Sequence, residues 1–430
     1  MIKYIFPKSR MKVHIVGAGP TGMSLAWEIL RSGDHEVTIY DKKLSAGGSW
    51  WEPTEEIRDL HAHRILFDKA FVNTQSLFSE MGINWDDMFQ PSKNTYKIDD
   101  YGTIVSLYAK VLAQPEKYKS ISLKDAVGDG NHPTIEHWSL IMDGVTWDVM
   151  SAYEFVKNID YVLLSKGYTQ RVSGKIMCDA MEEAVLNVGG NFIFNTELNE
   201  LEYGDDSFIA KFSNGTVIND GMLFLCIDNS PALNFLDDNW GPDADKKVRE
   251  STYGALNILL DYDEPIKIKS DLEFAANTEW KLQPVVLSDG KTISCVICNI
   301  TEEIAKTNPE VLKAEVLKQL DVPEPVDVRI GWGATWNGEV WETSQSSGVL
   351  SLHGQLPFFG KCPKVAMCGM MSPRNTPFSS IEASVEVSRA LSHIVFETRQ
   401  PLQPLLLSQV IIFTIVILIV LVLLYRNIDR

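Results

Sequence analysis

Hydrophobic positions near the start of the chain change their period within a short stretch. Lys12–Val16 is an apolar run typical of a buried strand, and Met23–Leu30 follows with the spacing of a helix that Gly33 ends. Glu36–Tyr40 is strand-like again and is followed directly by Asp41. The pattern therefore predicts a strand, a helix and a second strand, which together form the βαβ unit of a parallel sheet.

The turn between the first strand and the helix contains the pattern G-x-G-x-x-G, formed around Gly17, Gly19, Pro20, Thr21 and Gly22. In dinucleotide-binding folds the first glycine makes the tight turn, the second lets the backbone approach a pyrophosphate, and the third lets helix and strand pack closely. The start of the helix then faces the anion with its amides. Asp41, 19 positions after the last glycine, is expected to bond a ribose hydroxyl. We therefore expect a dinucleotide site here, with Lys42 as a further contact.

A second glycine pair indicates which dinucleotide is bound. Gly47 and Gly48 follow Asp41 closely and lead into Ser49 and Trp50. A pair at this point is typical of FAD-binding proteins, in which the backbone passes close to the diphosphate a second time. The chain has no second G-x-G-x-x-G pattern. One dinucleotide, FAD, is therefore expected, and no metal site.

The C-terminal region has a different pattern. Residues 405–425 contain no charged side chain, and Pro401 and Pro404 precede them. As a helix this stretch would be roughly 30 Å long, which matches the hydrocarbon core of a bilayer. Tyr425 and Arg426 can lie at the far interface. We therefore expect a single C-terminal transmembrane helix of the tail-anchored type, with a lipid bilayer as partner.

Charge and cysteine content limit the other partners. The formal net charge is −18, with 57 acidic and 39 basic side chains, so a nucleic acid partner is not expected. The six cysteines are scattered over 430 residues and do not form a disulfide framework. The first residues have no apolar stretch long enough for a signal peptide. The bulk of the protein is therefore expected to face the cytosol, while the oligomeric state stays open.

Several blocks, in this order, resemble the FAD-dependent amine oxidoreductases, the superfamily of the monoamine and polyamine oxidases. The first is the βαβ unit with its glycine pair. Gly167–Asp205 looks like the family's segment beside the adenine of FAD and implies a contact at Leu198, and Leu223–Leu236 is similar to the strand that returns to the FAD domain. Val365–Leu391 resembles the closing segment, whose last helix points at the flavin, and implies cofactor contacts at Gly369, Met370, Ile381 and Glu382.

The resemblance also implies a domain organisation. The fold would be α/β, with a Rossmann-like FAD-binding domain interleaved with an α+β substrate domain and followed by the transmembrane helix. The FAD-binding domain would comprise residues 1–69, 166–251 and 346–398. The substrate domain would comprise residues 70–165 and 252–345, with a small-molecule pocket where the two domains meet.

Differences from the family pattern affect the expected function. Ser49 stands where the family usually has an arginine on the diphosphate, and Met370 stands where an acidic residue is expected. Many members have a lysine beside the flavin, whereas the matching stretch here, around Asn257, has none. Val340 replaces the cysteine that holds the flavin covalently in monoamine oxidases, so the resemblance implies non-covalent FAD.

Four side chains are candidate substrate contacts. Trp336 and Trp341 flank a segment that looks like the aromatic wall of the monoamine oxidase pocket, although tryptophans here also suit a plain core. His61 and His63 lie where the family brings the chain near the flavin and substrate, although surface positions are an alternative.

Three functional hypotheses follow. The first is a membrane-anchored FAD-dependent oxidase or dehydrogenase of amines or other small organic molecules. The second is a flavin-fold protein that has lost turnover and has a structural or interaction role at a membrane, as the changes at Ser49, Met370 and Asn257 suggest. The third, a flavin monooxygenase, depends only on the sequence Gly48-Ser49-Trp50 and predicts that NADPH is consumed.

Overall fold

The computed structural model describes residues 10–52, 65–92, 100–143, 145–268, 278–287, 290–297, 300–331, 334–343, 346–348 and 354–428. Its centre is a five-stranded parallel sheet in the order β19-β10-β1-β2-β6. The strands are β1 (Lys12–Val16), β2 (Glu36–Tyr40), β6 (Asn191–Ile193), β10 (Met222–Leu225) and β19 (Val365–Met367). Both strands and the helix of the predicted βαβ unit are confirmed, and the fold class is α/β with a Rossmann-like unit.

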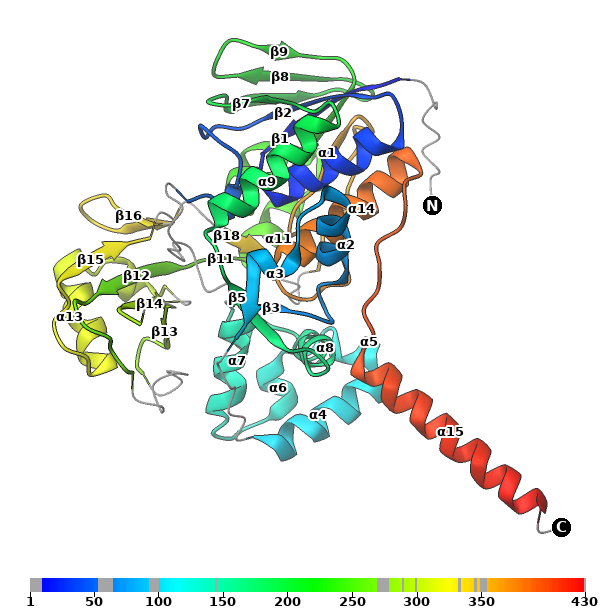
Figure 1. Ribbon diagram of the computed structural model, residues 1–430, viewed down its shortest axis with the longest axis vertical. Coiled ribbons are helices and arrows are strands. Elements are labelled where there is room, and N and C mark those ends of the chain that lie inside the picture. The colour runs from blue at the N-terminus through cyan, green and yellow to red at the C-terminus, as the bar shows by residue number, and fades with distance from the viewer. Residues whose placement is uncertain are drawn as a thin grey trace.

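Helices cover one face of this sheet, and a small antiparallel sheet covers the other (Figure 1). On the first face lie α1 (Pro20–Ser32), α9 (Gly174–Asn187) and α14 (Ile381–Phe396), with α2 (Val72–Met81) against α14. The antiparallel strands β7 (Leu198–Tyr203), β8 (Phe208–Phe212) and β9 (Val217–Ile218) lie on the second face, with α11 (Ala244–Ser251). Both faces need a cover because side chains of β1 alternate between them. Val13 and Ile15 pack in the core on the helix side, and Val16 packs in the core beside β7–β9.

A helical group and a second sheet make up the rest of the body. The helical group consists of α4 (Tyr101–Ala113), α5 (Pro115–Tyr118), α6 (Leu123–Val127), α7 (Pro133–Asp143) and α8 (Ala152–Val162). The sheet has the order β13-β14-β12-β15, with β13 (Leu282–Val286), β14 (Thr292–Ile297), β12 (Leu256–Asp261) and β15 (Asp327–Ile330). Against it pack α12 (Glu302–Ala305), α13 (Pro309–Leu320) and the hairpin of β16 (Ala334–Trp336) and β17 (Trp341–Thr343).

Short elements connect these parts. They are η1 (Gly48–Trp50), β3 (Leu66–Phe67), α3 (Trp85–Met88), β4 (Phe89–Pro91), β5 (Gly167–Gln170), α10 (Asn229–Ala232), η2 (Leu233–Phe235), η3 (Asp237–Trp240), β11 (Thr252–Gly254) and β18 (Ser346–Gly348). The strands of the parallel sheet all fall in the three segments expected to form the FAD-binding domain. The domain boundaries themselves stay a prediction.

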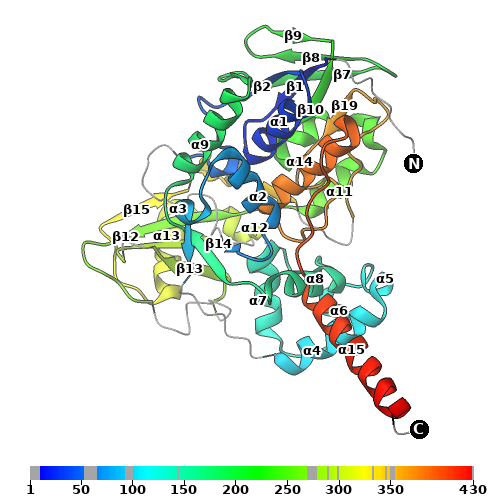
Figure 2. The same ribbon diagram turned by 45° about the vertical axis from the view of Figure 1, so that its right-hand side comes forward.

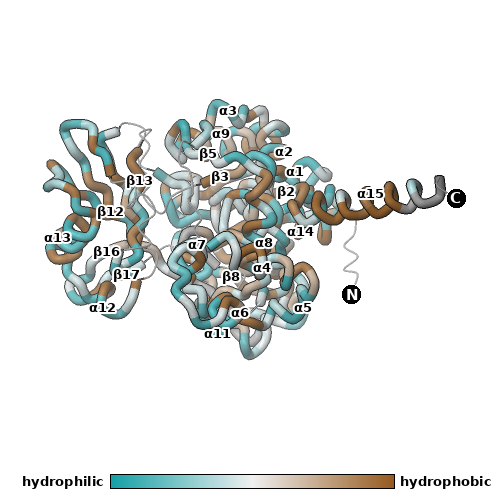
Figure 3. Tube along the Cα trace, turned by 90° about the horizontal axis from the view of Figure 1, so that it is seen from below, coloured by the Kyte–Doolittle hydropathy of each residue, from teal (hydrophilic) through white to brown (hydrophobic). Residues whose placement is uncertain are grey.

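The C-terminal helix α15 (Leu407–Ile428) projects from the body (Figures 1, 2 and 3). Its side chains from Ile412 to Val422 are exposed and apolar, apart from Thr414. The expected transmembrane helix is nevertheless not supported. A span requires about 20 predominantly apolar residues in one helix, and no helix within the described part of the chain is both long and apolar enough to cross a membrane.

Candidate dinucleotide site

The residues expected to bind the cofactor follow the carboxyl ends of neighbouring parallel strands. Gly17 follows β1, Asp41 follows β2, Cys226 follows β10 and Cys368 follows β19. In open α/β sheets ligands bind at this edge, where the strand order reverses on either side of the first strand. The sheet therefore brings together residues that lie far apart in the sequence.

The first glycine turn packs too closely for any side chain. Gly17 has φ +107°, and a Cβ on it would lie 2.3 Å from the Cys226 carbonyl oxygen. A Cβ on Gly22 would lie 1.9 Å from the Gly17 oxygen. The predicted roles of both glycines, a tight turn and close packing of helix and strand, are thus visible in the backbone.

The two glycine turns touch each other. A Cβ on Gly48, which has φ +55°, would lie 2.8 Å from the Gly19 Cα, and the Gly47 amide donates to the Ala18 carbonyl at 2.9 Å. The 3-10 turn η1 then continues the second loop into Trp50. Two bare backbone segments therefore lie side by side at the start of α1, as a diphosphate needs.

Helix α1 begins in this turn without a cap. Gly19 is the N-cap residue and makes no side-chain hydrogen bond, and Pro20 occupies the first helical position. The amides of the first turn, including that of Thr21, have no partner within the helix in an ordinary α-helix. The N-terminal end of α1 can therefore receive an anion.

Asp41 is bonded to the glycine turn itself. Its Oδ2 accepts from the Ala18 amide at 2.7 Å, and its Oδ1 accepts from the Lys43 amide at 2.8 Å. These two bonds fix the carboxylate between the glycine turn and the end of β2. Each carboxylate oxygen can accept a second bond, so the expected ribose contact stays compatible with this geometry.

Lys43 is a residue that the sequence reasoning missed. Its Nζ donates to the Gly48 carbonyl at 2.9 Å and lies 5.1 Å from the centre of the Trp51 ring. Burial lowers the pKa of Lys43, while the nearby Asp41 opposes that shift. The ammonium lies on the second glycine turn, so Lys43 supplies a positive charge in the loop where Ser49 replaces the expected arginine.

The segment that precedes β7 lies beside the end of β2. The Thr196 amide donates to the Asp41 carbonyl at 2.8 Å, and Lys42 Nζ lies 3.6 Å from Glu197 Oε1 in an exposed ion pair. Leu198 is buried in the core between the central sheet and β7–β9. The structure therefore brings Lys42 and Leu198 to the same end of the site as Asp41, and the expected contact with adenine stays a prediction.

The remaining residues of the second glycine loop differ in exposure. Ser49 is exposed, whereas Trp50 is buried with its ring 6.3 Å from that of Phe89. A Cβ on Gly174 would lie only 2.3 Å from the Trp50 carbonyl oxygen. Glycine at the start of α9 thus lets this helix approach the loop, and Trp50 anchors the loop to the core.

The closing segment forms a turn stabilised by a serine. The Ser372 hydroxyl accepts from the Gly369 amide at 3.0 Å and donates to the Met367 carbonyl at 2.9 Å. The Met370 carbonyl accepts from Arg374 Nε at 3.1 Å. The turn thus accepts from a buried guanidinium, and Met370 brings no negative charge to the sheet edge.

Helix α14 begins at Ile381, and its second residue is bonded to another helix. Glu382 is fully buried, and its carboxylate accepts from the amides of Asn73 and Thr74, the Asn73 Nδ2 and the Thr74 hydroxyl at 2.7–2.9 Å. Burial raises the pKa of Glu382 to about 7, and the four donors oppose that shift. Its observed contacts hold the start of α2, and the expected cofactor contact stays a prediction.

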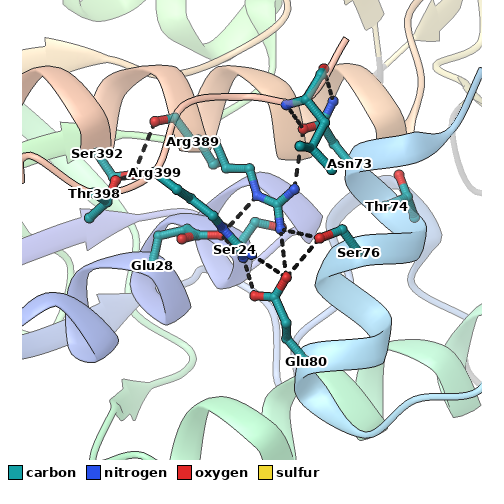
Figure 4. Close-up of polar contacts among 12 residues, drawn as sticks. Ser24, Glu28, Asn73, Thr74, Ser76, Glu80, Arg389, Ser392, Thr398 and Arg399 are labelled. Carbon is teal, nitrogen blue, oxygen red and sulfur yellow. Dashed lines mark hydrogen bonds and ion pairs between the residues drawn. The ribbon is translucent and has the colours of Figure 1, made fainter. Parts of the chain in front are cut away.

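A charge network lies between α1, α2 and α14 (Figure 4). Arg389 of α14 is fully buried and donates from Nε to Glu28 of α1 at 2.9 Å and from Nη2 to Glu80 of α2 at 3.2 Å. Arg399 also donates to Glu28, at 2.7 Å, and pairs with Glu80. The network fixes the nucleotide helix α1 relative to α2 and α14.

The candidate substrate contacts lie elsewhere. Trp336 and Trp341 face each other across the β16–β17 hairpin with ring centres 5.5 Å apart, and the Trp341 indole donates to the Thr307 carbonyl at 2.7 Å. Both pack in the core between the second sheet and α13. Their observed role is packing, and a substrate contact stays a prediction. His61 and His63 lie outside the described residues.

Sheet topology and glycine turns define a Rossmann-type dinucleotide-binding unit, and comparison with known families agrees. A family model described as an NAD(P)-binding Rossmann-like domain matches residues 15–69. Thiamine thiazole synthase from Pyrococcus horikoshii is 27% identical over 169 residues, which are 38% of this chain and 60% of that protein. The homologue from Thermococcus kodakarensis is 22% identical over 214 residues, 49% of this chain and 78% of that protein.

Solved structures match nearly the whole chain. Wild-type putrescine oxidase bound to putrescine has a TM-score of 0.64 and 13% identity, covering 91% of this chain and 100% of its own. The CLA-producing fatty acid isomerase from P. acnes has a TM-score of 0.63 and 12% identity, covering 90% and 99%. At such identities the likeness shows the fold. The resemblance to the FAD-dependent amine oxidoreductases predicted from the sequence is confirmed at that level.

Proposed function

We propose that this chain is an FAD-dependent oxidoreductase that oxidises a small organic molecule. The observation that carries the proposal is the contact between the two glycine turns, at Gly19 and Gly48, beside the uncapped start of α1. A single glycine turn suffices for many nucleotides, whereas two bare segments, the second with a lysine ammonium bonded to it, suit the extended diphosphate of FAD.

Each residue at the site has a distinct share in binding. The amides at the start of α1 and the Lys43 ammonium hold the diphosphate, and Asp41 holds the ribose. FAD, when bound, supplies a two-electron acceptor for a hydride from the substrate. The protein orients it against the substrate domain and excludes water. With Val340 in place of the family's cysteine, binding is non-covalent.

The absorption spectrum of the purified full-length chain in detergent tests this proposal. We expect the flavin bands near 370 and 450 nm, and we expect acid or heat to release the flavin into the supernatant. The resemblance favours amines as the first substrates to screen, beside acids and alcohols of the same size. Bleaching of the 450 nm band by a substrate under argon supports turnover.

Other outcomes separate the alternatives. A protein that stays colourless after incubation with FAD refutes the proposal. A yellow protein that no substrate bleaches favours the flavin-fold protein without turnover. Oxidation of NADPH without added substrate favours the monooxygenase. Binding of NAD in place of FAD, measured by calorimetry, favours the dinucleotide named by the family that matches residues 15–69.

We also propose that α15 attaches the protein to a lipid bilayer, with the body on the cytosolic side. The support is the run of exposed apolar side chains from Ile412 to Val422, which would bury their surface in lipid. The helix is held to the body at its base, because Ser408 donates its amide and hydroxyl to Asp160, each at 2.6 Å.

Flotation with phosphatidylcholine vesicles tests the attachment. The full-length chain is expected to float with the vesicles, and a variant that ends at residue 406 is expected to stay at the bottom. Equal flotation of both chains, or of neither, refutes the role of α15. Protease treatment of the vesicles then reports whether the last residues are protected.

A further inference from the structure

One histidine in the helical group is buried without a partner. His137, on α7, is 2% exposed, and neither of its ring nitrogens has a hydrogen-bond partner among the described residues. A buried polar group without a bond costs free energy, so such a group needs an explanation. His137 belongs neither to the cofactor site nor to the charge network between α1, α2 and α14.

The side of α7 that carries His137 faces the second sheet. Leu140, three residues further on and therefore on the same side of the helix, packs against Ala255 and Val296. Ile135 and Trp138 lie on the other side, in the core of the helical group. In Figures 1 and 3, α7 and α13 lie on opposite sides of this sheet. His137 is thus on the face of the sheet that α13 does not cover.

That face of the sheet carries a row of polar side chains. Gln283 of β13 and Asn257 of β12 both pair with Val296 of the strand between them. The Asn257 Nδ2 donates to Ser294, two residues along on the same face, at 3.2 Å. All three polar side chains are buried. The row runs across the strands beside the point where Leu140 packs.

An ion pair lies near His137, and its cation, Lys281, acts on the imidazole. Lys281 precedes β13, and it lies 3.7 Å from Glu136 of α7. Since Leu282 points to the α13 side, Gln283 points to the face of His137, and Lys281, which precedes the strand, is brought to α7 by its contact with Glu136. Burial, with a smaller effect of the Lys281 charge, lowers the pKa of His137 to about 4. At pH 7 the imidazole is therefore neutral, with one donor and one acceptor nitrogen.

We propose that His137 and the row Gln283–Asn257–Ser294 bind the polar head of the substrate, and that this head is an oxygen acceptor, a carboxylate or hydroxyl, on an apolar body. An oxygen head accepts from the imidazole N–H, and Leu140 and Val296 contact the apolar part. A protonated amine is disfavoured because it would place a second cation beside Lys281 and compete with it for the Glu136 carboxylate. The inference rests on the proposed function only in placing a substrate in this domain.

The test measures binding directly at His137. In the FAD-loaded full chain with 13C-labelled histidine, the His137 resonance is assigned from its loss in His137→Gln. Hexanoate, hexanol and hexylamine serve as probes of equal length. We expect hexanoate and hexanol to shift the His137 resonance in a saturable way, and hexylamine to leave it unchanged.

Variants and calorimetry complete the test. His137→Phe is expected to weaken hexanoate binding at least tenfold, while His137→Gln, which keeps a donor and an acceptor, stays within about threefold. His132→Phe, on the residue just before α7, is the matched control and keeps the wild-type affinity. An equal shift with hexylamine, or no shift with any probe, overturns the inference. The 450 nm band reads the cofactor separately, so failure of FAD binding is distinguishable from failure at His137.

Discussion

Replacing Arg389 by methionine tests whether the buried charge network holds the nucleotide helix in place. The substitution keeps much of the aliphatic volume of the side chain and removes its guanidinium. In the wild type this group is fully buried and donates to Glu28 at 2.9 Å, to Asn73 at 3.2 Å and to Glu80 at 3.2 Å. All three acceptors lie on α1 and α2.

The expected loss follows from what the substitution leaves behind. Removing one partner of a buried ion pair costs about 3–5 kcal/mol, because the other charge stays buried and uncompensated. Arg399 still reaches Glu28 at 2.7 Å and keeps part of the pairing. We therefore expect Arg389→Met to lower the free energy of unfolding by about 3 kcal/mol, at the lower end of that range.

Urea unfolding of the detergent-solubilised protein, followed by tryptophan fluorescence, measures this loss. Arg249→Met is the matched control, because Arg249 makes a bidentate contact with Asp245 on the surface of α11. Exposed pairs of this kind contribute little, so no measurable change is expected there. A loss below about 1 kcal/mol for Arg389→Met, or equal losses for both variants, would refute the reasoning.

Three further predictions concern the cofactor site and His137. Gly48→Ala, which introduces a Cβ 2.8 Å from the neighbouring glycine turn, is expected to abolish FAD retention on gel filtration. Lys43→Met is expected to raise the Kd for FAD about tenfold by fluorescence titration, whereas Lys42→Met, on an exposed ion pair, changes it less. Burial and Lys281 lower the pKa of His137 to about 4, below 6.5 in the unfolded chain. The unfolded state therefore takes up the proton first, and unfolding free energy should fall by up to about 3 kcal/mol between pH 6.5 and 4. His137→Phe should remove that part of the loss.

The parts of the fold that could be predicted are those whose requirements are local. Gly17 and Gly22 are needed because of contacts within one turn, so their spacing identifies the turn from the sequence alone. The two strands on either side of α1 were predicted with the observed bounds. The expectation for the C-terminal segment was wrong in part, because a helix forms there but the described chain contains no helix suited to cross a membrane.

Polar side chains with distant partners could not be placed in the same way. Lys43 and Lys42 are adjacent and alike in sequence, yet only the packing of the second glycine loop brings the Lys43 ammonium to the Gly48 carbonyl. Glu382 accepts from residues 308 and 309 positions away. Its acidic position in the closing segment suggested a cofactor contact, which stays a prediction, but no local pattern indicated the bonds with the start of α2.

The position of Lys43 also changes how the departures from the family pattern are weighed. Ser49, taken alone, suggests that the diphosphate has lost its cationic partner and that the chain has lost its cofactor. The structure shows a lysine ammonium bonded to the same loop, 2.9 Å from the Gly48 carbonyl oxygen. A loop can lose one cation and keep affinity if another side chain brings the charge to the same anion, because Coulomb attraction depends on position and not on sequence order. Ser49 therefore does not by itself favour the flavin-fold protein without turnover, and the comparison of Lys43→Met with Lys42→Met decides whether the charge has moved to Lys43.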